Sequence, residues 1–123
     1  AKAPGAHLQP VAVAGPDDLP AALADRTVVF AAGAAGVVLL PKAARRRCKT
    51  LRVAVDLNAV PPLGVEGVEV ADKGQERDGV IGYGALGVGD LKMKVHRAAV
   101  ARLFESNDQV LDAEEIYALA KAF

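Results

Sequence analysis

The chain has 123 residues, of which 52% are hydrophobic and 24% charged, and this composition suits one folded domain and argues against disorder. Its 15 basic side chains are balanced by 15 acidic ones, which leaves no basic surface for nucleic acid or an anionic membrane. No apolar run reaches the ~20 residues of a membrane span, and the single cysteine, Cys48, excludes an internal disulfide and favours the reducing cytoplasm.

The first half of the chain predicts alternating short helices and strands. Residues 17–24 indicate a short helix, with acidic residues in its first turn, where the helix dipole favours them. The continuous apolar run 27–32 predicts a strand that is buried on both faces. A helix follows over 41–47, with proline at its first position, and residues 51–57 predict a second buried strand.

The next segment combines loops with one further strand. The proline-rich residues 58–64 form a rigid loop that cannot be a helix or a central strand. Residues 65–70 alternate between apolar and polar, and residues 72–79 predict a polar turn. The run 80–83 predicts a strand, which leads into a glycine-rich loop at 84–89.

Two helices complete the chain. The first is predicted from about Asp90 to residues 106–108, with an apolar stripe that recurs every four residues at Leu91, Val95, Ala99 and Leu103. The second begins after Asp112, which forms a capping box with Glu115. Strands that alternate with helices predict an α/β fold with a mostly parallel sheet and flanking helices.

Three loops rich in glycine or proline follow predicted strands, at residues 31–36, 56–64 and 84–89. In an open parallel sheet, ligands bind outside the carboxyl ends of the strands, where glycines let a ligand approach the backbone. The three loops together favour a nucleotide-type ligand, although each alone is also explained as a tight turn. Residues 82–87 meet the GxGxxG spacing but follow several strands, so the pyrophosphate-binding turn of a complete dinucleotide fold is missing.

Few side chains outside these loops suggest chemistry, and no metal-ligand cluster, P-loop or nucleophile elbow is found in the sequence. Lys92 and Lys94 lie in the predicted first turn of a helix, where positive charge opposes the dipole. Such a position hints at function for Lys92, with a solvated lysine as the alternative. His96 shares a helical face with Lys92 and fits a surface side chain better, and Cys48 fits a buried or incidental thiol better than a reactive one.

Four segments carry a family resemblance: VVFAAGAAGVVLLP (28–41), DLNAVPPLGVEGVEVADKG (56–74), GALGVGDLKMKVHRAAVARLFES (84–106) and DAEEIYALAKAF (112–123). They resemble the C-terminal part of the NADP-dependent methylene-tetrahydromethanopterin dehydrogenases, a methylotroph family that includes methylene-tetrahydrofolate dehydrogenases. The resemblance implies a Rossmann-type cofactor domain joined to a pterin-binding domain, with the active site between them. It also implies reversible hydride transfer between the methylene group of a tetrahydropterin and the nicotinamide, without metal or flavin.

The resemblance assigns roles to individual residues. Ala31, Ala32 and Gly33 would line the ribose and nicotinamide of the cofactor, Asp56 and Asn58 would approach the nicotinamide, and Gly84, Leu86 and Gly87 would complete its pocket. Lys92 matches a lysine that faces the substrate cleft and is the candidate catalytic residue, where it would contact a carbonyl or carboxylate of the carrier. Asp90 stands where the family has glycine, which places a carboxylate at the edge of the cleft.

The chain begins with Ala1 rather than methionine, and the resemblance places the pterin domain and the phosphate-binding turn upstream. We therefore expect residues 1–123 to form one unit, the C-terminal part of the cofactor domain of a cytoplasmic homo-oligomeric enzyme, inactive alone. The cofactor is NADP or NAD, and the carrier tetrahydromethanopterin or tetrahydrofolate. The alternative is a stand-alone Rossmann-like module that binds a ligand or partner without catalysis.

Overall fold

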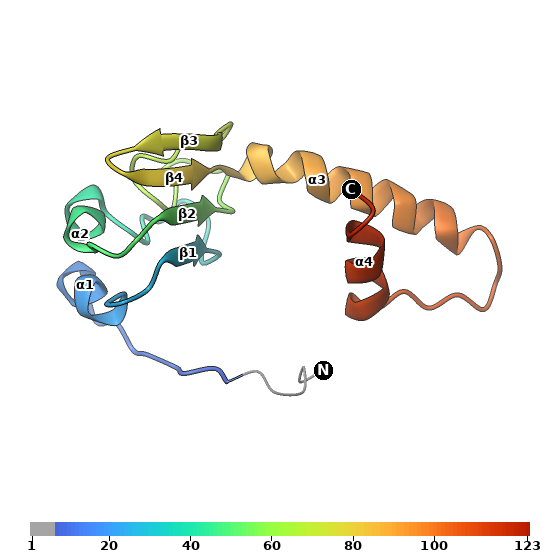
Figure 1. Ribbon diagram of the computed structural model, residues 1–123, viewed down its shortest axis with the longest axis horizontal. Coiled ribbons are helices and arrows are strands. Elements are labelled where there is room, and N and C mark those ends of the chain that lie inside the picture. Colours follow the sequence, from blue (N-terminus) through green and yellow to red (C-terminus); the bar gives the residue numbers. More distant parts are fainter. Residues whose placement is uncertain (1–6) are drawn as a thin grey trace.

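Four strands form one sheet and short helices flank it, in a computed structural model that describes residues 7–123 (Figure 1). The expectation that concerns Ala1 lies outside the described residues. The elements in chain order are η1 (Pro16–Asp18), α1 (Leu19–Ala22), β1 (Val28–Ala31), α2 (Lys42–Arg47), β2 (Val53–Asp56), β3 (Lys73–Arg77), β4 (Val80–Tyr83), α3 (Ala85–Leu103) and α4 (Ala113–Ala120). This order confirms the predicted α/β class.

Three parallel strands make up most of the sheet, whose order is β1-β2-β4-β3. β2 pairs in parallel with β1 on one side and with β4 on the other, and β3 is antiparallel to β4 at the edge. The arrangement is consistent with a Rossmann-like domain. Because β1, β2 and β4 run the same way, their carboxyl ends meet at one edge of the sheet.

The hydrophobic core lies on one face of this sheet, where α2 contributes Ala44 to it. Its buried members are Ala31, Leu40, Ala44, Cys48, Leu51, Ala54, Val65, Val68 and Val80, and Leu19 and Leu23 pack against them. Cys48 donates its thiol hydrogen to the carbonyl oxygen of Ala44, 3.3 Å away. Burial raises the pKa of the Cys48 thiol. The side chain is therefore a buried core thiol, the simpler of the two interpretations.

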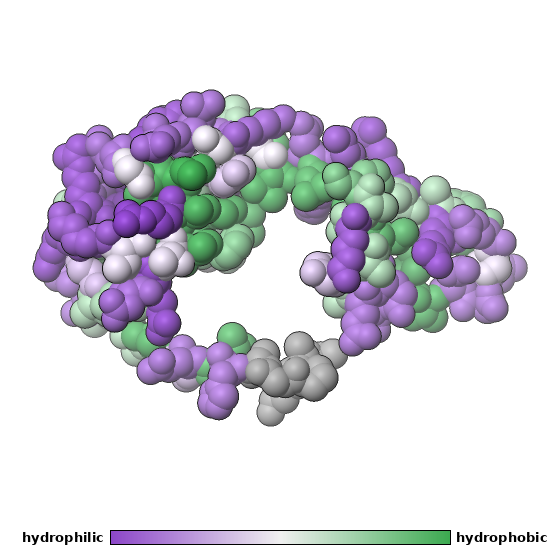
Figure 2. Space-filling view, viewed as in Figure 1, coloured by the Kyte–Doolittle hydropathy of each residue, from purple (hydrophilic) through white to green (hydrophobic). Residues whose placement is uncertain are grey.

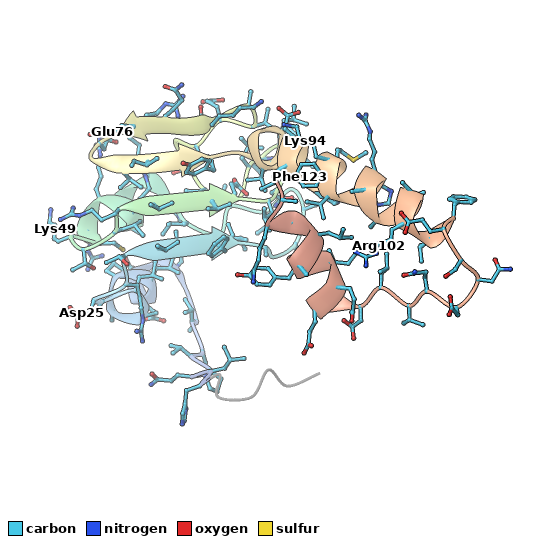
Figure 3. All side chains as sticks on the ribbon, turned by 45° about the vertical axis from the view of Figure 1, so that its right-hand side comes forward. Asp25, Lys49, Glu76, Lys94, Arg102 and Phe123 are labelled. Carbon is cyan, nitrogen blue, oxygen red and sulfur yellow. The ribbon has the colours of Figure 1, made fainter. Side chains whose placement is uncertain are left out.

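The opposite face of the sheet is open, so the prediction that run 27–32 is buried on both faces is wrong. Phe30 is 66% exposed and Val28 is 46% exposed. Figure 3 looks onto this face, and no helix crosses in front of the strands. Sheets of parallel strands are normally covered on both faces, which is why their strands are continuously apolar. Residues 7–123 cover only one face of this sheet.

β3 is the strand that the sequence analysis missed, because residues 72–79 were predicted to be a polar turn. Charged side chains are typical of an edge strand and hide its pattern. The hairpin between β3 and β4 turns at Asp78 and Gly79, whose φ values are +53° and +74°. An Asp-Gly pair with positive φ at both residues is a strong hairpin signal, and it identifies the strand on either side.

α3 begins at Ala85, well before the predicted start near Asp90. Its first turn packs on the loop that precedes β3, where the amide of Leu86 donates to the carbonyl of Val70 at 2.9 Å. Gly87 and Gly89 are therefore helical, and Lys92 lies beyond the second turn of the helix. The prediction that Lys92 opposes the helix dipole in the first turn is wrong.

α4 turns back against α3, which extends beyond the sheet (Figure 1). The predicted capping box is confirmed, since Asp112 accepts from the amide of Glu114 at 2.8 Å and its own amide donates to Glu115 at 3.1 Å. Of the predicted stripe on α3, Val95 and Ala99 are buried, whereas Leu91 and Leu103 are half exposed.

Among residues 7–123, no helix has the length and apolar character needed to cross a membrane.

Candidate functional site

The three predicted loops meet at the carboxyl edge of the sheet. Ala31 and Asp56 are register partners at the ends of β1 and β2, and Val55 is paired with Tyr83, the residue before Gly84. The side-chain amide of Asn58 donates to the carbonyl of Ala34 at 2.8 Å, which ties the first two loops together. The fold thus places the predicted cofactor residues on adjacent strand ends.

Asp56 organises the second loop with both of its carboxylate oxygens. Oδ1 accepts from the amide of Asn58 at 2.9 Å, and Oδ2 accepts from the amide of Val65 at 2.7 Å. The side chain is 1% exposed, and a Cβ added at Gly64 would lie 2.8 Å from Oδ1. The described contacts of Asp56 and Asn58 therefore hold the loops at this edge of the sheet.

Gly84 and Gly87 allow α3 to pack closely on the chain before β3. A Cβ at Gly84 would lie 2.0 Å from the carbonyl oxygen of Glu69, and one at Gly87 would lie 1.9 Å from that of Asp72. The amide of Gly84 donates to the carbonyl of Asp72 at 3.0 Å. Close packing of backbone on backbone accounts for both glycines.

Other residues of the predicted site are open to solvent. Ala32, Gly33, Leu86 and Lys92 are exposed, while Ala31 is buried. A Cβ at Gly33 would meet only the flexible side chain of Leu39. The accessible part of the predicted site is thus the end of β1 together with one side of α3.

Lys92 and Lys94 project from different sides of α3. Residues that are two positions apart on an α-helix differ by about 200° in direction around its axis. The two lysines therefore point in nearly opposite directions. Lys92 shares a face with Val95, three residues on, and Val95 is buried. The structure thus provides Lys94 as a matched exposed control for Lys92.

A surface depression of about 550 Å³ adjoins the first loop, lined by residues 13–16, Leu19 and residues 37–39. Neither the 56–64 loop nor the start of α3 lines it. The predicted cofactor residues are neighbours along an open edge of the sheet, and none of them lines this depression.

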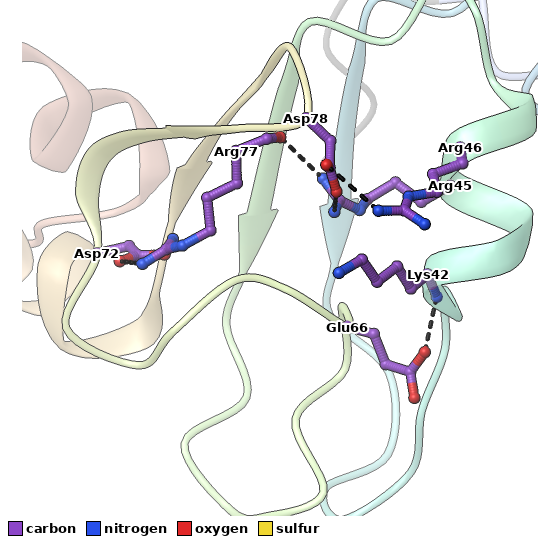
Figure 4. A network of polar contacts seen from close by, with 7 residues as sticks. All are labelled: Lys42, Arg45, Arg46, Glu66, Asp72, Arg77 and Asp78. Carbon is purple, nitrogen blue, oxygen red and sulfur yellow. Dashed lines mark hydrogen bonds and ion pairs between the residues drawn. The ribbon is translucent and has the colours of Figure 1, made fainter.

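The first turn of α2 holds a carboxylate from the chain itself. The amide of Lys42 donates to Oε2 of Glu66 at 2.7 Å (Figure 4). The start of a helix after the first strand is where a dinucleotide fold binds pyrophosphate. In this chain the carboxylate of Glu66 accepts the hydrogen of that amide.

A second polar network joins α2 to the β3–β4 hairpin at the other end of the strands (Figure 4). The buried Arg45 side chain lies 3.0 Å from Oδ2 of Asp78 and also donates to the carbonyl of Arg77. Arg46 bonds the other carboxylate oxygen of Asp78 and lowers the pKa of that carboxyl. These contacts explain the basic cluster after Pro41 as part of the framework.

Asp72 is a buried carboxylate that the sequence analysis passed over. It pairs with Arg77 through both oxygens and accepts from the amide of Glu69 at 2.8 Å. The Arg77 guanidinium holds the pKa of Asp72 below its usual range. The Asp-Gly hairpin signal at 78–79 would have placed Arg77 on a strand and made this pairing foreseeable.

Among residues 7–123, no three His, Cys, Asp or Glu side chains gather as a metal site would require.

Comparison with known proteins gives two relatives from Methylorubrum extorquens. The bifunctional protein MdtA is 54% identical over 93 residues, which are 76% of this chain and 32% of MdtA. The chain resembles part of a longer protein. The NAD(P)-dependent methylenetetrahydromethanopterin dehydrogenase of the same organism is 34% identical over 108 residues, which are 85% of this chain and 36% of that enzyme.

The chain spans about a third of the length of these curated relatives. No family model matches it. The second relative agrees in name with the family that the sequence motifs resemble, which supports that resemblance at a coarse level. The roles of individual site residues stay predictions.

Proposed function

We propose that this chain supplies the nicotinamide side of the active site of an oxidoreductase. The reaction is hydride transfer between the methylene group of a tetrahydropterin C1 carrier, tetrahydromethanopterin or tetrahydrofolate, and NADP or NAD, which yields the methenyl carrier. The observation that carries the proposal is the identity of 34% to a dehydrogenase of that name over 85% of the chain. The adjacent strand ends that bear the three predicted loops support it.

The residues at the carboxyl edge fit one end of a dinucleotide. Ala32 and Gly33 are small and exposed at the end of β1, so a flat ring system can approach their backbone. Glu66 already takes the first amide of α2, and a phosphate there would meet a carboxylate. The pyrophosphate is therefore held by residues outside this chain, and the chain contacts the ribose and nicotinamide.

When bound, the nicotinamide supplies the carbon that accepts or donates the hydride. The chain's own residues orient it and exclude water. Asp56 and Asn58 fix the loop beside β1, and Gly84 and Gly87 bring α3 close to the same edge. The methenyl product is a cation delocalised over the nitrogens of the carrier, so the step needs little acid–base help. Holding the two carbons in attack geometry is then the main contribution.

Lys92 would act on the carrier rather than on the transferred hydride. An ammonium next to the forming cation would be unfavourable, whereas an ammonium on a carbonyl or carboxylate of the carrier would orient it. In a polypeptide that joins this chain to the unmatched two thirds of a relative, Lys92→Ala should lower kcat/KM by about 10- to 100-fold, the loss of one charge-assisted contact. Lys94→Ala, on the other side of α3, should change it less than about twofold. Equal effects of the two substitutions would remove Lys92 from the site.

The direct test compares the 123-residue chain with a polypeptide that joins it to the two thirds of a relative that it does not match. With the methylene carrier and NADP or NAD, the longer protein should produce reduced nicotinamide and the chain alone should not. A longer protein that folds and reduces neither cofactor with either carrier would overturn the proposal.

A non-catalytic binding module is the second candidate, and the open face of the sheet favours it because such a face invites association. The native intact mass separates the two. A species of 12.7 kDa made as such in the cell would support the module, and a larger species would support the enzyme.

A further inference from the structure

Basic side chains gather in one stretch of the chain, although the totals of the two charges balance. The three arginines at 45–47 end α2, where positive charge counters the helix dipole. Lys49 and Arg52 follow the end of α2, so the dipole does not account for them. Between Asp25 and Asp56 the chain has no acidic residue and seven basic ones, which are Arg26, Lys42, Arg45, Arg46, Arg47, Lys49 and Arg52.

Four of these basic side chains surround a depression at the amino ends of the strands. It has a volume of about 370 Å³ and is bordered by the end of α2, the loop that follows α2, and the turn of the β3–β4 hairpin. Figure 2 shows hydrophilic surface at this end of the molecule, on the left. Among the described residues, the charged ones that line the depression are Arg45, Arg46, Lys49, Arg52 and Asp78. Four positive charges and one negative charge leave three positive charges without a counter-charge in the lining.

Asp78 shows that the arginines of this depression hold an oxyanion. Its Oδ2 lies 3.0 Å from Nη2 of Arg45, and its Oδ1 lies 3.4 Å from Nη2 of Arg46 (Figure 4). Guanidinium groups suit phosphate oxygens as well as carboxylate oxygens. The Arg45 side chain is 2% exposed, and its Nε is buried with no acceptor among the described residues. A buried donor without an acceptor lowers stability, so a further anion beside this guanidinium would compensate for the missing contact.

Lys49 and Arg52 are available to a ligand. Both are exposed, and neither forms an ion pair with any residue in 7–123. The backbone of Arg52 is fixed, because its amide donates to the carbonyl of Thr27 at 2.8 Å and its carbonyl accepts from the amide of Ile81 at 2.8 Å. Lys49 stands at the same end of the strands (Figure 3). The backbone thus positions these two cations, while their charged ends stay free.

The depression suits a small ligand that joins a charged group to an uncharged body. Its volume equals that of about twelve water molecules, which is more than one phosphate group fills. Leu51 and Val80 add apolar side chains to the lining. A phosphate ester carries about two negative charges near neutral pH and matches the surplus of positive charge better than one carboxylate does. Pockets for drug-sized ligands measure about 300–1,000 Å³, so the ligand is smaller than a dinucleotide.

We propose that this depression is a second ligand site, which binds a small molecule through a terminal phosphate ester or diphosphate group. Arg46, Lys49 and Arg52 donate hydrogen bonds to the phosphate oxygens, and Arg45 supplies a fixed positive charge in the wall. The site lies at the amino ends of the strands, whereas the candidate cofactor residues lie at the carboxyl ends, about 13 Å away along a four-residue strand. The inference therefore does not rest on the proposed hydride transfer, and either can fail without the other.

The test titrates the isotope-labelled chain with pyrophosphate and with ribose 5-phosphate at constant ionic strength and follows the backbone amides by NMR. We expect at least one of the two probes to bind with a Kd below about 1 mM. The amide signals of residues 45–52 and 78–80 should shift, and those of residues 31–36 and 84–89 should not. Acetate, which carries one negative charge, should bind at least about tenfold more weakly.

Two substitutions that remove the same charge separate the depression from general attraction of anions. Arg52→Gln should weaken binding by at least about tenfold, because it removes one charge-assisted contact. Arg47 is close in sequence but does not line the depression, so Arg47→Gln should change Kd less than about twofold in 150 mM salt. Both side chains are exposed, and circular dichroism checks that both variants fold.

A second pair of substitutions should increase affinity at one position only. Asp78→Asn removes the carboxylate that competes for Arg45 and Arg46 and should tighten binding by at least about threefold. Asp25 also has a positive φ, +62° against +53° at Asp78, and does not line the depression. Asp25→Asn should therefore leave Kd within about twofold. Asparagine tolerates this backbone conformation, and if Asp78→Asn fails to fold, the two arginine variants decide.

Three results would overturn the inference. The first is the absence of binding by both probes, and the second is an equal effect of Arg52→Gln and Arg47→Gln. The third is a set of shifts confined to residues 31–36 and 84–89, which would place the anion at the carboxyl edge. A single-stranded oligonucleotide that binds where neither probe does would also contradict it, because the basic surface would then serve a nucleic-acid backbone.

Discussion

Two glycines in α3 should respond to alanine with opposite signs. A Cβ at Gly87 would lie 1.9 Å from the carbonyl oxygen of Asp72, while a Cβ at Gly89 would have no atom within 4 Å. For Gly87→Ala, the helix must move by more than an ångström, which strains the bond from Leu86 to Val70. Overpacking of this kind costs about 1–3 kcal/mol and a strained hydrogen bond about 1 kcal/mol, against about 1 kcal/mol gained in helix propensity.

The net expectation is a loss of about 1–3 kcal/mol for Gly87→Ala and a gain of about 0.5–1 kcal/mol for Gly89→Ala. Urea unfolding followed by circular dichroism measures both, with unchanged m-values as the check that the unfolding reaction is the same. If both substitutions stabilise the chain equally, the first turn of α3 does not pack on Asp72.

Two further predictions concern buried groups. Asp72→Asn should lower the free energy of unfolding near neutral pH by about 1–3 kcal/mol. Because its pairing with Arg77 lowers the folded pKa below 3.8, the stability that Asp72 contributes is complete above that value and is lost as pH falls through the folded pKa. Between pH 7 and pH 3, the free energy of unfolding should therefore fall less with decreasing pH for the variant than for the wild type. The same dependence on pH in both proteins would refute the pairing. The Cys48 thiol should react with a thiol reagent only after unfolding, since burial raises its pKa; rapid labelling of the folded chain would contradict its place in the core.

Much of the fold could be predicted from local patterns. The apolar runs at 27–32, 51–57 and 80–83 are the three parallel strands, and the Asp112–Glu115 capping box starts α4 as expected. Such features depend on neighbouring residues alone, which is why sequence patterns identify them.

The start of α3 and the strand β3 depend on contacts distant in sequence. Glycines at 84, 87 and 89 indicate a loop by propensity, but the carbonyls of Val70 and Asp72 accept amides of the first turn and stabilise a helix there. β3 is charged, and its pairing with β4 and the ion pair between Asp72 and Arg77 hold it in the sheet.

The sequence predicts that the three loops lie at one edge of the sheet, but it does not predict the contacts of their residues. The sequence places three loops at one edge, and the sheet register brings them together. The sequence does not predict that both carboxylate oxygens of Asp56 accept hydrogen bonds from loop amides. Nor does it predict that Glu66 accepts a hydrogen bond from the first amide of α2. The bonds from Val65 to Asp56 and from Lys42 to Glu66 join residues 9 and 24 positions apart, and no local pattern encodes them.

The central claim is that the carboxyl edge of this sheet binds the nicotinamide end of the cofactor. Amide hydrogen exchange of the polypeptide that joins this chain to the unmatched two thirds of a relative, with and without NADP, tests it most directly. The account predicts that cofactor slows exchange in residues 31–36 and 84–89, and leaves the β3–β4 hairpin at the far end of the strands unchanged. Protection at the hairpin with none in these loops would contradict it.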